Sequence, residues 1–371
     1  MNDRVSLYPG RVTLTPVAGQ ANTYDMARAD QPTQEGTPLN KASLLQDVVC
    51  DILGLDYTAT PNDALMSLAL PSGKYAISVT LKSPGGRPMH GVTLSGIVTA
   101  AGNSVVTNNN GVGFGFATTS PVTVTADISS FLDLTGTASV TLTPKASVVN
   151  KTAITCTRAS SAQTTLSSSK TVRFSPDVSE YDWSAIGGGF NGSEGSGTEI
   201  SAEEVAYGGN GGNAGGVINQ AGVVYNGGSI SVVVGGIGGK SGVNNTLSGN
   251  GAIGGLGGKI GDEQPSLYRK AVAGGNTTGF LYPKTQVGGA GGGGRAIIGS
   301  SGRSAPAAVG GTPGGGNGSE SINNTGSDGS LPGSGGGGGC GRSIWNSATG
   351  EGTAGGRGKP GLVGFMWRYK S

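Results

Sequence analysis

The stretch Gly335-Gly-Gly-Gly-Gly339 is the densest part of a C-terminal region in which glycine dominates the composition. The chain has 371 residues and 74 glycines, of which 14 precede residue 187. About one residue in three after that point is glycine, against a usual share of about 7%. Runs such as Gly208-Gly-Asn-Gly-Gly-Asn-Ala-Gly-Gly216 break the third-position glycine that collagen requires. The region is therefore not a collagen helix.

Apolar stretches between the glycine runs distinguish this region from a disordered linker. A glycine-rich linker lacks the apolar residues that offset the entropy lost on folding. Here such residues recur, for example in Ile230-Ser-Val-Val-Val234 and Leu362-Val-Gly-Phe-Met-Trp367. Because glycine has no Cβ, neighbouring backbones can approach closely and bond to one another. Two architectures are open: three-fold polyglycine helices packed side by side, or a β-core that projects glycine loops.

The composition divides the chain into four parts. Residues 1–72 contain two predicted amphipathic helices, one that begins at the N-cap Asn40 and one that begins at Thr60. Residues 73–146 follow a β pattern, and residues 147–170 form a connector rich in Ser and Thr. The glycine-rich domain covers 171–371. The expected fold is mainly β and multidomain.

Alternation over residues 73–146 predicts short β-strands. Tyr75, Ile77 and Val79 alternate with smaller or polar residues, and turn clusters such as Asn108-Asn-Asn-Gly111 recur at short intervals. Such spacing predicts an antiparallel sandwich of about seven strands. The turn Gly86-Arg-Pro-Met-His-Gly-Val92 resembles that of the carboxypeptidase-regulatory-like immunoglobulin fold, which implies a spacer module.

Charge, cysteine content and hydropathy exclude several classes of function. With 24 basic and 22 acidic side chains, the chain offers no basic patch for nucleic acid. The three cysteines, Cys50, Cys156 and Cys340, are too far apart for a CxxC metal site or a disulfide framework read from spacing. Neither a signal peptide nor an apolar run long enough to span a membrane is visible. We expect no cofactor and no metal.

Three motifs with possible chemistry have simpler interpretations. Val234-Gly-Gly-Ile-Gly-Gly-Lys-Ser241 ends like a phosphate-binding loop, but a valine replaces the first glycine and no helix pattern follows. The single histidine, His90, lies in a predicted turn without an acid or serine constellation. Glu199, Glu203 and Glu204 have the chemistry of glycosidase carboxylates, but we expect a solvated acidic loop. No catalytic residue is predicted.

Aromatic side chains among the glycines are the candidate binding residues. Tyrosine and tryptophan can stack on sugar rings or anchor a protein receptor. The candidates for receptor binding are Phe190, Tyr207, Tyr282 and Trp345. The same residues could instead form the small core of a domain poor in side chains, and for Tyr207 and Trp345 the sequence does not separate the two roles.

The order of four segments resembles the glycine-rich domain of bacteriophage and prophage tail fibres. A strand that ends in Phe-x-Pro opens the domain, and further strands lie between the glycine runs. The matching segments begin at Lys170-Thr-Val-Arg-Phe-Ser-Pro176, Val223-Val-Tyr225, Ser266-Leu-Tyr268 and Gly358-Lys-Pro-Gly361. The N-terminal run Gly10-Arg-Val-Thr-Leu-Thr-Pro-Val17 also looks like the start of tail proteins from phages of Gram-positive hosts.

The resemblance implies a receptor-binding protein of the virion and not an enzyme. Residues 1–72 would bind other tail or baseplate proteins, and the C-terminal domain would contact a host receptor, either glycan or protein. Fibres are commonly symmetric, so a homotrimer is expected. Two alternatives stay open: a purely structural tail component, and a polysaccharide depolymerase that depends on Glu203 or Glu204.

Overall fold

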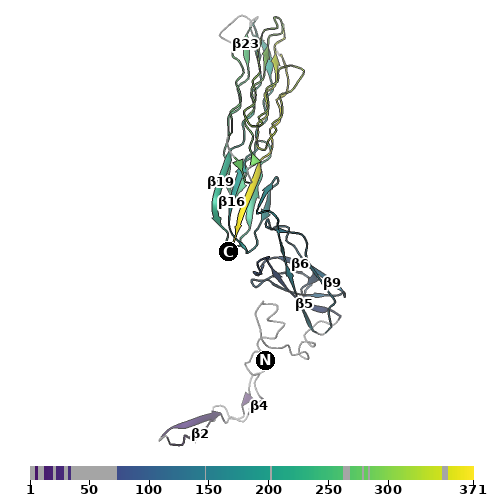
Figure 1. The fold of residues 1–371 in the computed structure, drawn as a ribbon, viewed down its shortest axis with the longest axis vertical. Coiled ribbons are helices and arrows are strands. Elements are labelled where there is room, and N and C mark those ends of the chain that lie inside the picture. Colours follow the sequence, from purple (N-terminus) through teal and green to yellow (C-terminus); the bar gives the residue numbers. More distant parts are fainter. Residues whose placement is uncertain are drawn as a thin grey trace. The chain divides into compact units, whose positions relative to one another are not determined.

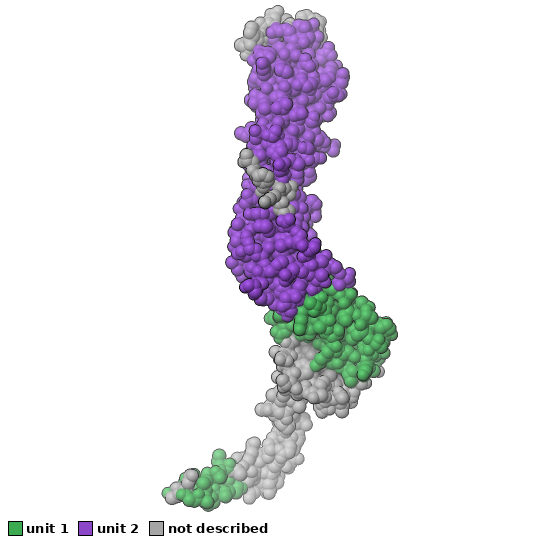
Figure 2. Space-filling model, viewed as in Figure 1, with its two compact units in different colours: residues 1–82, 88–127, 138–155 green, residues 83–87, 128–137, 156–371 purple. Residues whose placement is uncertain are grey.

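All regular elements in the described part of the chain are β-strands (Figure 1). This finding confirms the prediction of a mainly β protein. The chain forms two compact units: unit 1 comprises 1–82, 88–127 and 138–155, and unit 2 comprises 83–87, 128–137 and 156–371 (Figure 2). The computed structural model describes residues 5–6, 12–19, 22–28, 32–34, 73–146, 148–200, 203–261, 268–277, 280–282, 285–344 and 350–371.

Two small antiparallel sheets lie in the N-terminal part. One pairs β1 (Val5–Ser6) with β4 (Pro32–Gln34), and the other pairs β2 (Val12–Pro16) with β3 (Tyr24–Arg28). The extended stretch that the sequence predicts near Val12 is thus a hairpin strand. The two helices predicted after Asn40 and Thr60 lie outside the described residues.

Unit 1 contains a seven-stranded sheet in the order β11-β9-β6-β8-β5-β12, with β7 paired to β6. The alternation that predicts β5 places Ile77, Val79 and Leu81 in the core, where each is fully buried. Ala76 on the other face is also buried, so β5 is covered on both sides. The strands are β5 (Tyr75–Lys82), β6 (Thr93–Val98), β7 (Ser104–Val106), β8 (Val112–Ala117), β9 (Val122–Ala126), β11 (Ala138–Leu142) and β12 (Val149–Thr155).

The predicted connector, residues 147–170, contains strands. β12 runs parallel to β5 and completes the edge of the unit 1 sheet, with Val149 opposite Ala76. β13 (Thr157–Arg158) pairs with β10 (Leu134–Thr135), and β14 (Gln163–Leu166) pairs with the last strand of the chain. These strands are rich in Thr and contain few large apolar residues, which is why the apolar pattern does not reveal them.

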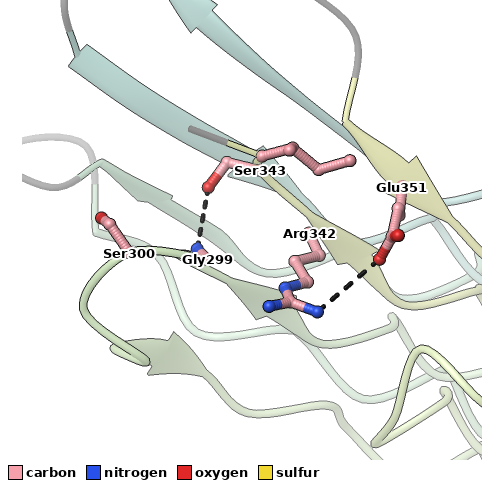
Figure 3. Close-up of a pocket in the computed structure, with 6 residues that line it drawn as sticks. Gly299, Ser300, Arg342, Ser343 and Glu351 are labelled. Atoms are coloured by element: carbon pink, nitrogen blue, oxygen red, sulfur yellow. Dashed lines mark hydrogen bonds and ion pairs between the residues drawn. The ribbon is translucent and has the colours of Figure 1, made fainter. Parts of the chain in front are cut away.

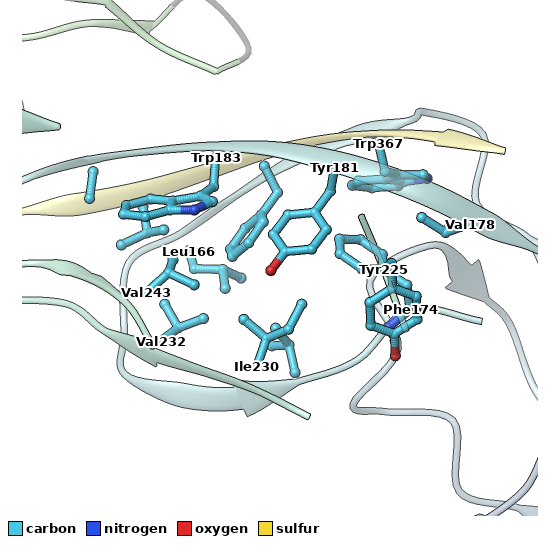
Figure 4. Close-up of a cluster of buried hydrophobic side chains, with 14 residues drawn as sticks. Leu166, Phe174, Val178, Tyr181, Trp183, Tyr225, Ile230, Val232, Val243 and Trp367 are labelled. Carbon is cyan, nitrogen blue, oxygen red and sulfur yellow. The ribbon is translucent and has the colours of Figure 1, made fainter. Parts of the chain in front are cut away.

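The hydrophobic core of unit 2, which we call the β-core, lies between two four-stranded sheets (Figure 4). Phe174 is at its centre, with ring centroids 5.3 Å from Tyr181 and 5.4 Å from both Tyr225 and Trp367. Truncation of such a buried ring costs about 3–5 kcal/mol. One sheet contains β14, β30 (Leu362–Tyr369), β16 (Val178–Ile186) and β19 (Val217–Val224), and the other β15 (Lys170–Val172), β20 (Ile230–Val233), β21 (Gly242–Val243) and β22 (Thr246–Leu247).

Extended segments without strand pairing continue from the β-core, and we call them the glycine bundle. A short hairpin of β24 (Phe280–Leu281) and β25 (Thr285–Gln286) lies where the bundle begins, because Leu281 packs with Ile186 and Val287. The segments cover residues 187–195, 208–216, 249–258, 270–277, 287–295, 306–319, 326–340 and 353–361.

Hydrogen bonds in the glycine bundle recur every third residue. Along the segment 333–341, N–H groups three residues apart bind the same neighbouring segment, and the N–H groups one position later bind a different segment. Gly335, Gly338 and Gly341 donate to the carbonyls of Gly289, Gly292 and Arg295 at 2.9–3.0 Å, whereas Gly336 and Gly339 donate to those of Phe190 and Ser193. The backbone polar groups are therefore satisfied by surrounding segments and not by a two-sided sheet.

Glycine is required in the bundle because the segments touch backbone to backbone. A Cβ at Gly338 would overlap the carbonyl of Gly209, and one at Gly337 would overlap that of Asn317. The same holds on a third side, where a Cβ at Gly336 would overlap the carbonyl of Gly356. All three faces of this segment are therefore closed to any side chain, which explains the five consecutive glycines.

Candidate functional site

The glycine bundle ends in two small sheets on the side away from the β-core, and we call this part the far end (Figure 1). The chain reverses direction here several times, so a set of turns between the long segments lies at this end. One sheet has the order β17-β18-β23 and the other β27-β26-β28-β29. Their strands are β17 (Ser196–Ile200), β18 (Glu203–Tyr207), β23 (Lys259–Gly261), β26 (Ala296–Ile297), β27 (Ser304–Ala305), β28 (Gly341–Arg342) and β29 (Glu351–Gly352).

A small apolar core holds the two sheets of the far end together. Ala206 of β18 and Ile260 of β23 pack against Ala296, Ile298 and Ala305, and all five are buried. Because side chains alternate along a strand, the neighbours of Ala206 and Ile260 face away from this core. The far end thus has an inner side, packed against this core, and an opposite side on which Tyr207 and Lys259 are half-buried.

A pocket opens at the far end beside the turn after Ile298 (Figure 3). Its volume is about 280 Å³, and it is lined by Gly299, Ser300, Arg342, Ser343, Ile344 and Glu351. Arg342 and Glu351 are opposite each other on β28 and β29, with Nη1 3.7 Å from Oε2. Gly299 N donates to Ser343 Oγ at 3.0 Å, which fixes the rim. The pocket offers hydroxyls, a guanidinium and a carboxylate to a polar ligand.

Glu204 is buried beneath the same turn. Its Oε2 accepts hydrogen bonds from the Ser300 N–H at 3.1 Å and from the Ser300 hydroxyl. Its Oε1 is buried without a hydrogen-bond partner among the described residues. The expectation of a solvated acidic loop was wrong at this position. Glu204 is two residues before Ala206 on β18, so both side chains lie on the inner face, where Ser300 compensates for the burial of Glu204.

The candidate aromatics are not gathered at one place. Tyr207 lies on β18 at the far end, where it is half-buried. Phe190 is 40% exposed on the side of the bundle, with its ring against Gly238. Tyr282 is half-buried near the β-core, where its N–H donates to Ser184 Oγ at 2.7 Å. Trp345 lies outside the described residues, one position after the pocket residue Ile344.

Two of the three motifs with possible chemistry, His90 and the segment that resembles a phosphate-binding loop, have the simpler structure that the sequence predicts. His90 is exposed between β5 and β6. Lys240 and Ser241 lead into strand β21 and not into a helix, and Ser241 Oγ accepts a bond from Gly235 N at 2.9 Å. The glycine loop therefore folds on itself as a hairpin.

The pocket residues Ser300, Arg342 and Glu351 were not identified from the sequence. Residues 345–349, between Arg342 and Glu351, lie outside the described residues, and the glycine-rich sequence around the two side chains contains no recognisable motif. Within the described residues no group of three or more metal-ligating side chains comes together. Nor do these residues include a helix of the length and apolarity that crossing a membrane needs.

Comparison with known proteins adds no further identification. No protein-family model matches the chain, and a search of curated proteins finds no match either. The resemblance to phage tail fibres thus stays a prediction.

Proposed function

We propose that this protein is a tail fibre or receptor-binding protein that attaches a phage virion to the surface of its host. In this proposal residues 1–72 bind other tail or baseplate proteins, residues 73–146 form an immunoglobulin-like spacer, and the far end of the glycine bundle contacts the receptor. The assembly is a homotrimer. The protein catalyses no reaction.

The main support for this proposal is the backbone-to-backbone packing of the glycine bundle, which leaves no room for side chains between the segments. Its segments are held by hydrogen bonds at every third residue, as expected of three-fold polyglycine helices. A body of this kind is rigid but offers few side chains, because a Cβ at positions such as Gly338 would overlap a neighbouring backbone. Recognition is then left to the turns, which vary without disturbing the scaffold. A rigid support that presents turns at its far end suits an adhesive tip.

The position of Glu204 weighs against the depolymerase alternative. A glycosidase carboxylate must reach the scissile bond of the substrate. The Glu204 side chain is fully buried and bonded to Ser300, so it is not available to a polysaccharide chain. The pocket beside it supports binding, since Arg342 and the serine hydroxyls can donate to a receptor and Glu351 can accept.

Binding of the full chain to bacteria tests the proposal. We would label the purified chain, establish its oligomeric state by light scattering, and titrate it onto a panel of bacterial strains. The double variant Arg342→Ala/Glu351→Ala removes both charges of the pocket without changing the net charge. A matched control, Lys170→Ala/Glu180→Ala, removes one charge of each sign from strands β15 and β16, which flank the β-core.

Saturable binding to one strain, in competition with virion adsorption, is the expected result. The pocket variant should then bind at least about tenfold more weakly, as when one charged anchor is lost, whereas the control should bind like the parent. Absence of binding by the folded chain to every strain, including the host, would instead favour a purely structural tail component.

A further inference from the structure

We propose that a row of side chains across the far end, Tyr207, Lys259 and Arg269, binds an anionic polysaccharide. This inference rests on the proposed function, because it names the chemical class of the receptor. The row is separate from the pocket lined by Arg342 and Glu351.

Strand register places these three residues side by side. Tyr207 of β18 is opposite Lys259 of β23, and Lys259 forms an antiparallel bridge with Arg269. The bridge has both hydrogen bonds, at 2.8 Å and 2.7 Å. Directly opposite residues of an antiparallel pair project from the same face of the sheet. The three side chains therefore form one continuous row.

The row faces outward. Ala206 and Ile260, the strand neighbours of Tyr207 and Lys259, are buried in the apolar core of the far end. Alternation along each strand then directs Tyr207 and Lys259 to the opposite, outer face. Arg269 is exposed, and Tyr268 beside it is 43% exposed. Tyr207 and Lys259 are half-buried and Val205 on the same face of β18 is buried, so a ligand reaches the row best from its exposed end at Arg269.

Two cations opposite each other are an unfavourable pair without an anion. Like charges at directly opposite positions destabilise a sheet. Lys259 Nζ lies 5.3 Å from the centre of the Tyr207 ring, and the Arg269 guanidinium is fixed by bonds from Nε and Nη2 to the carbonyl of Gly257. Neither cation has a carboxylate within ion-pair distance among the described residues. An anionic group over the pair would relieve the repulsion.

The length and composition of the row favour a polymer over a single ion. Strands are about 4.8 Å apart, so the row from Ser196, which is opposite Tyr207, to Arg269 is roughly 14 Å long. Fixed cations at one end of the row pair with sulfate, phosphate or carboxylate groups. The tyrosine ring and the Ser196 hydroxyl provide apolar and polar contacts for sugar rings between those groups.

Binding of the full chain to polymers of matched backbone tests this inference. Dextran sulfate and unmodified dextran would be immobilised as probes, with polygalacturonate as a carboxylate polymer and a single-stranded oligonucleotide as a non-sugar polyanion. The test variant is Lys259→Gln/Arg269→Gln. The control, Lys170→Gln/Lys240→Gln, makes the same change in charge near the β-core, where both lysines are exposed.

We expect binding to dextran sulfate or polygalacturonate, no binding to dextran, and a loss of affinity on addition of salt. The test variant should bind about tenfold more weakly or worse, because two charge-assisted hydrogen bonds are lost, and the control should bind like the parent. Lys259→Arg should retain the affinity. Equal binding of the test variant and the control, or oligonucleotide binding as tight as that of the polysaccharides, would overturn the inference.

Cell binding separates failure of this inference from failure of the proposed function. If Lys259→Gln/Arg269→Gln loses polymer binding but binds host cells normally, the row is not the receptor site and the inference fails, while the proposed function stands. If the parent chain binds no cells at all, the proposed function itself fails.

Discussion

The side-chain Oδ1 of Asn213 accepts a hydrogen bond from the Gly254 N–H at 2.8 Å, in the place of a backbone carbonyl. Asn210, three residues earlier, does the same for Gly257 at 2.8 Å. In the interior of the glycine bundle such N–H groups bind the carbonyl of another segment. For Gly254 and Gly257 an asparagine side-chain oxygen satisfies the donor instead. The repeat Gly-Gly-Asn-Gly-Gly-Asn thus follows the three-residue period of the bundle.

Replacement of Asn213 by alanine should destabilise the bundle. The Gly254 N–H then loses its acceptor, and because this donor is half-buried we expect a loss of about 1 kcal/mol, the low end of the cost of an unpaired buried donor. Asn213→Asp retains an acceptor at the same place and should be much closer to the parent. Chemical denaturation of both variants, followed by tryptophan fluorescence, measures the difference in the free energy of unfolding. Equal stability of the alanine and aspartate variants would show that the cap contributes nothing.

A single methyl group at Gly338 should prevent the bundle from forming. The added Cβ of Gly338→Ala would overlap the backbone of Gly209, and no side-chain movement can relieve a backbone clash. Gly236→Ala is the matched control, because a Cβ at Gly236 meets nothing within 4 Å. It should be neutral, or more stable by about 0.4–1 kcal/mol through the unfolded state.

Limited proteolysis distinguishes the two alanine variants. Gly338→Ala should expose the glycine-rich region to cleavage at protease concentrations that leave the parent and Gly236→Ala intact. Similar resistance of both variants would mean that the close packing around Gly338 is not required.

Side-chain alternation made the strands predictable. Tyr75–Lys82 and Leu362–Tyr369 are the strands that their patterns of apolar residues indicate. The arrangement of the glycine segments was not predictable in the same way, since glycine has no side chain to mark an inner face. Sequence alone left polyglycine helices and a β-core as alternatives. The β-core exists around Phe174, and the extended segments continue from it.

The candidate site was less predictable than the fold. Tyr207 was selected as an isolated aromatic, but its neighbours Lys259 and Arg269 come from distant segments joined by backbone pairing. That register depends on glycine contacts that leave no pattern in the sequence. The prediction of a solvated loop failed at Glu204. Adjacent acidic residues normally indicate such a loop, but strand alternation directs the Glu204 side chain inward and Ser300 donates hydrogen bonds to it there.

Cys340 should report on the opening of the glycine bundle. Its thiol is fully buried, and burial raises its pKa to about 11 from an ordinary value of 9.0. The reactive thiolate is then roughly 100-fold scarcer at pH 8 than in a free cysteine, before any effect of access. In a Cys50→Ser/Cys156→Ser background, iodoacetamide should label Cys340 slowly in the native protein and rapidly in denaturant. Labelling at the rate of a free thiol under native conditions would contradict a closed bundle.

The stability of unit 2 should depend on pH through Asp133. Desolvation raises the pKa of this carboxyl above its ordinary value of 3.8, even though Ser175 donates to it from both N–H and hydroxyl. A raised pKa means that the folded state holds the proton more tightly than the unfolded chain. The stabilisation is therefore complete below pH 3.8 and is lost as the pH rises through the folded-state pKa.

Asp133→Asn isolates this contribution, because asparagine keeps the shape and the acceptor for the Ser175 N–H but does not titrate. The difference in unfolding free energy, variant minus parent, should increase with pH from about 3.8 upward and then level off. Denaturant titrations of both proteins between pH 3 and pH 8 provide this difference, in which the carboxylates that do not interact with Asp133 cancel. A difference that stays constant with pH, or that falls as the pH rises, would show that burial does not favour the protonated form of Asp133.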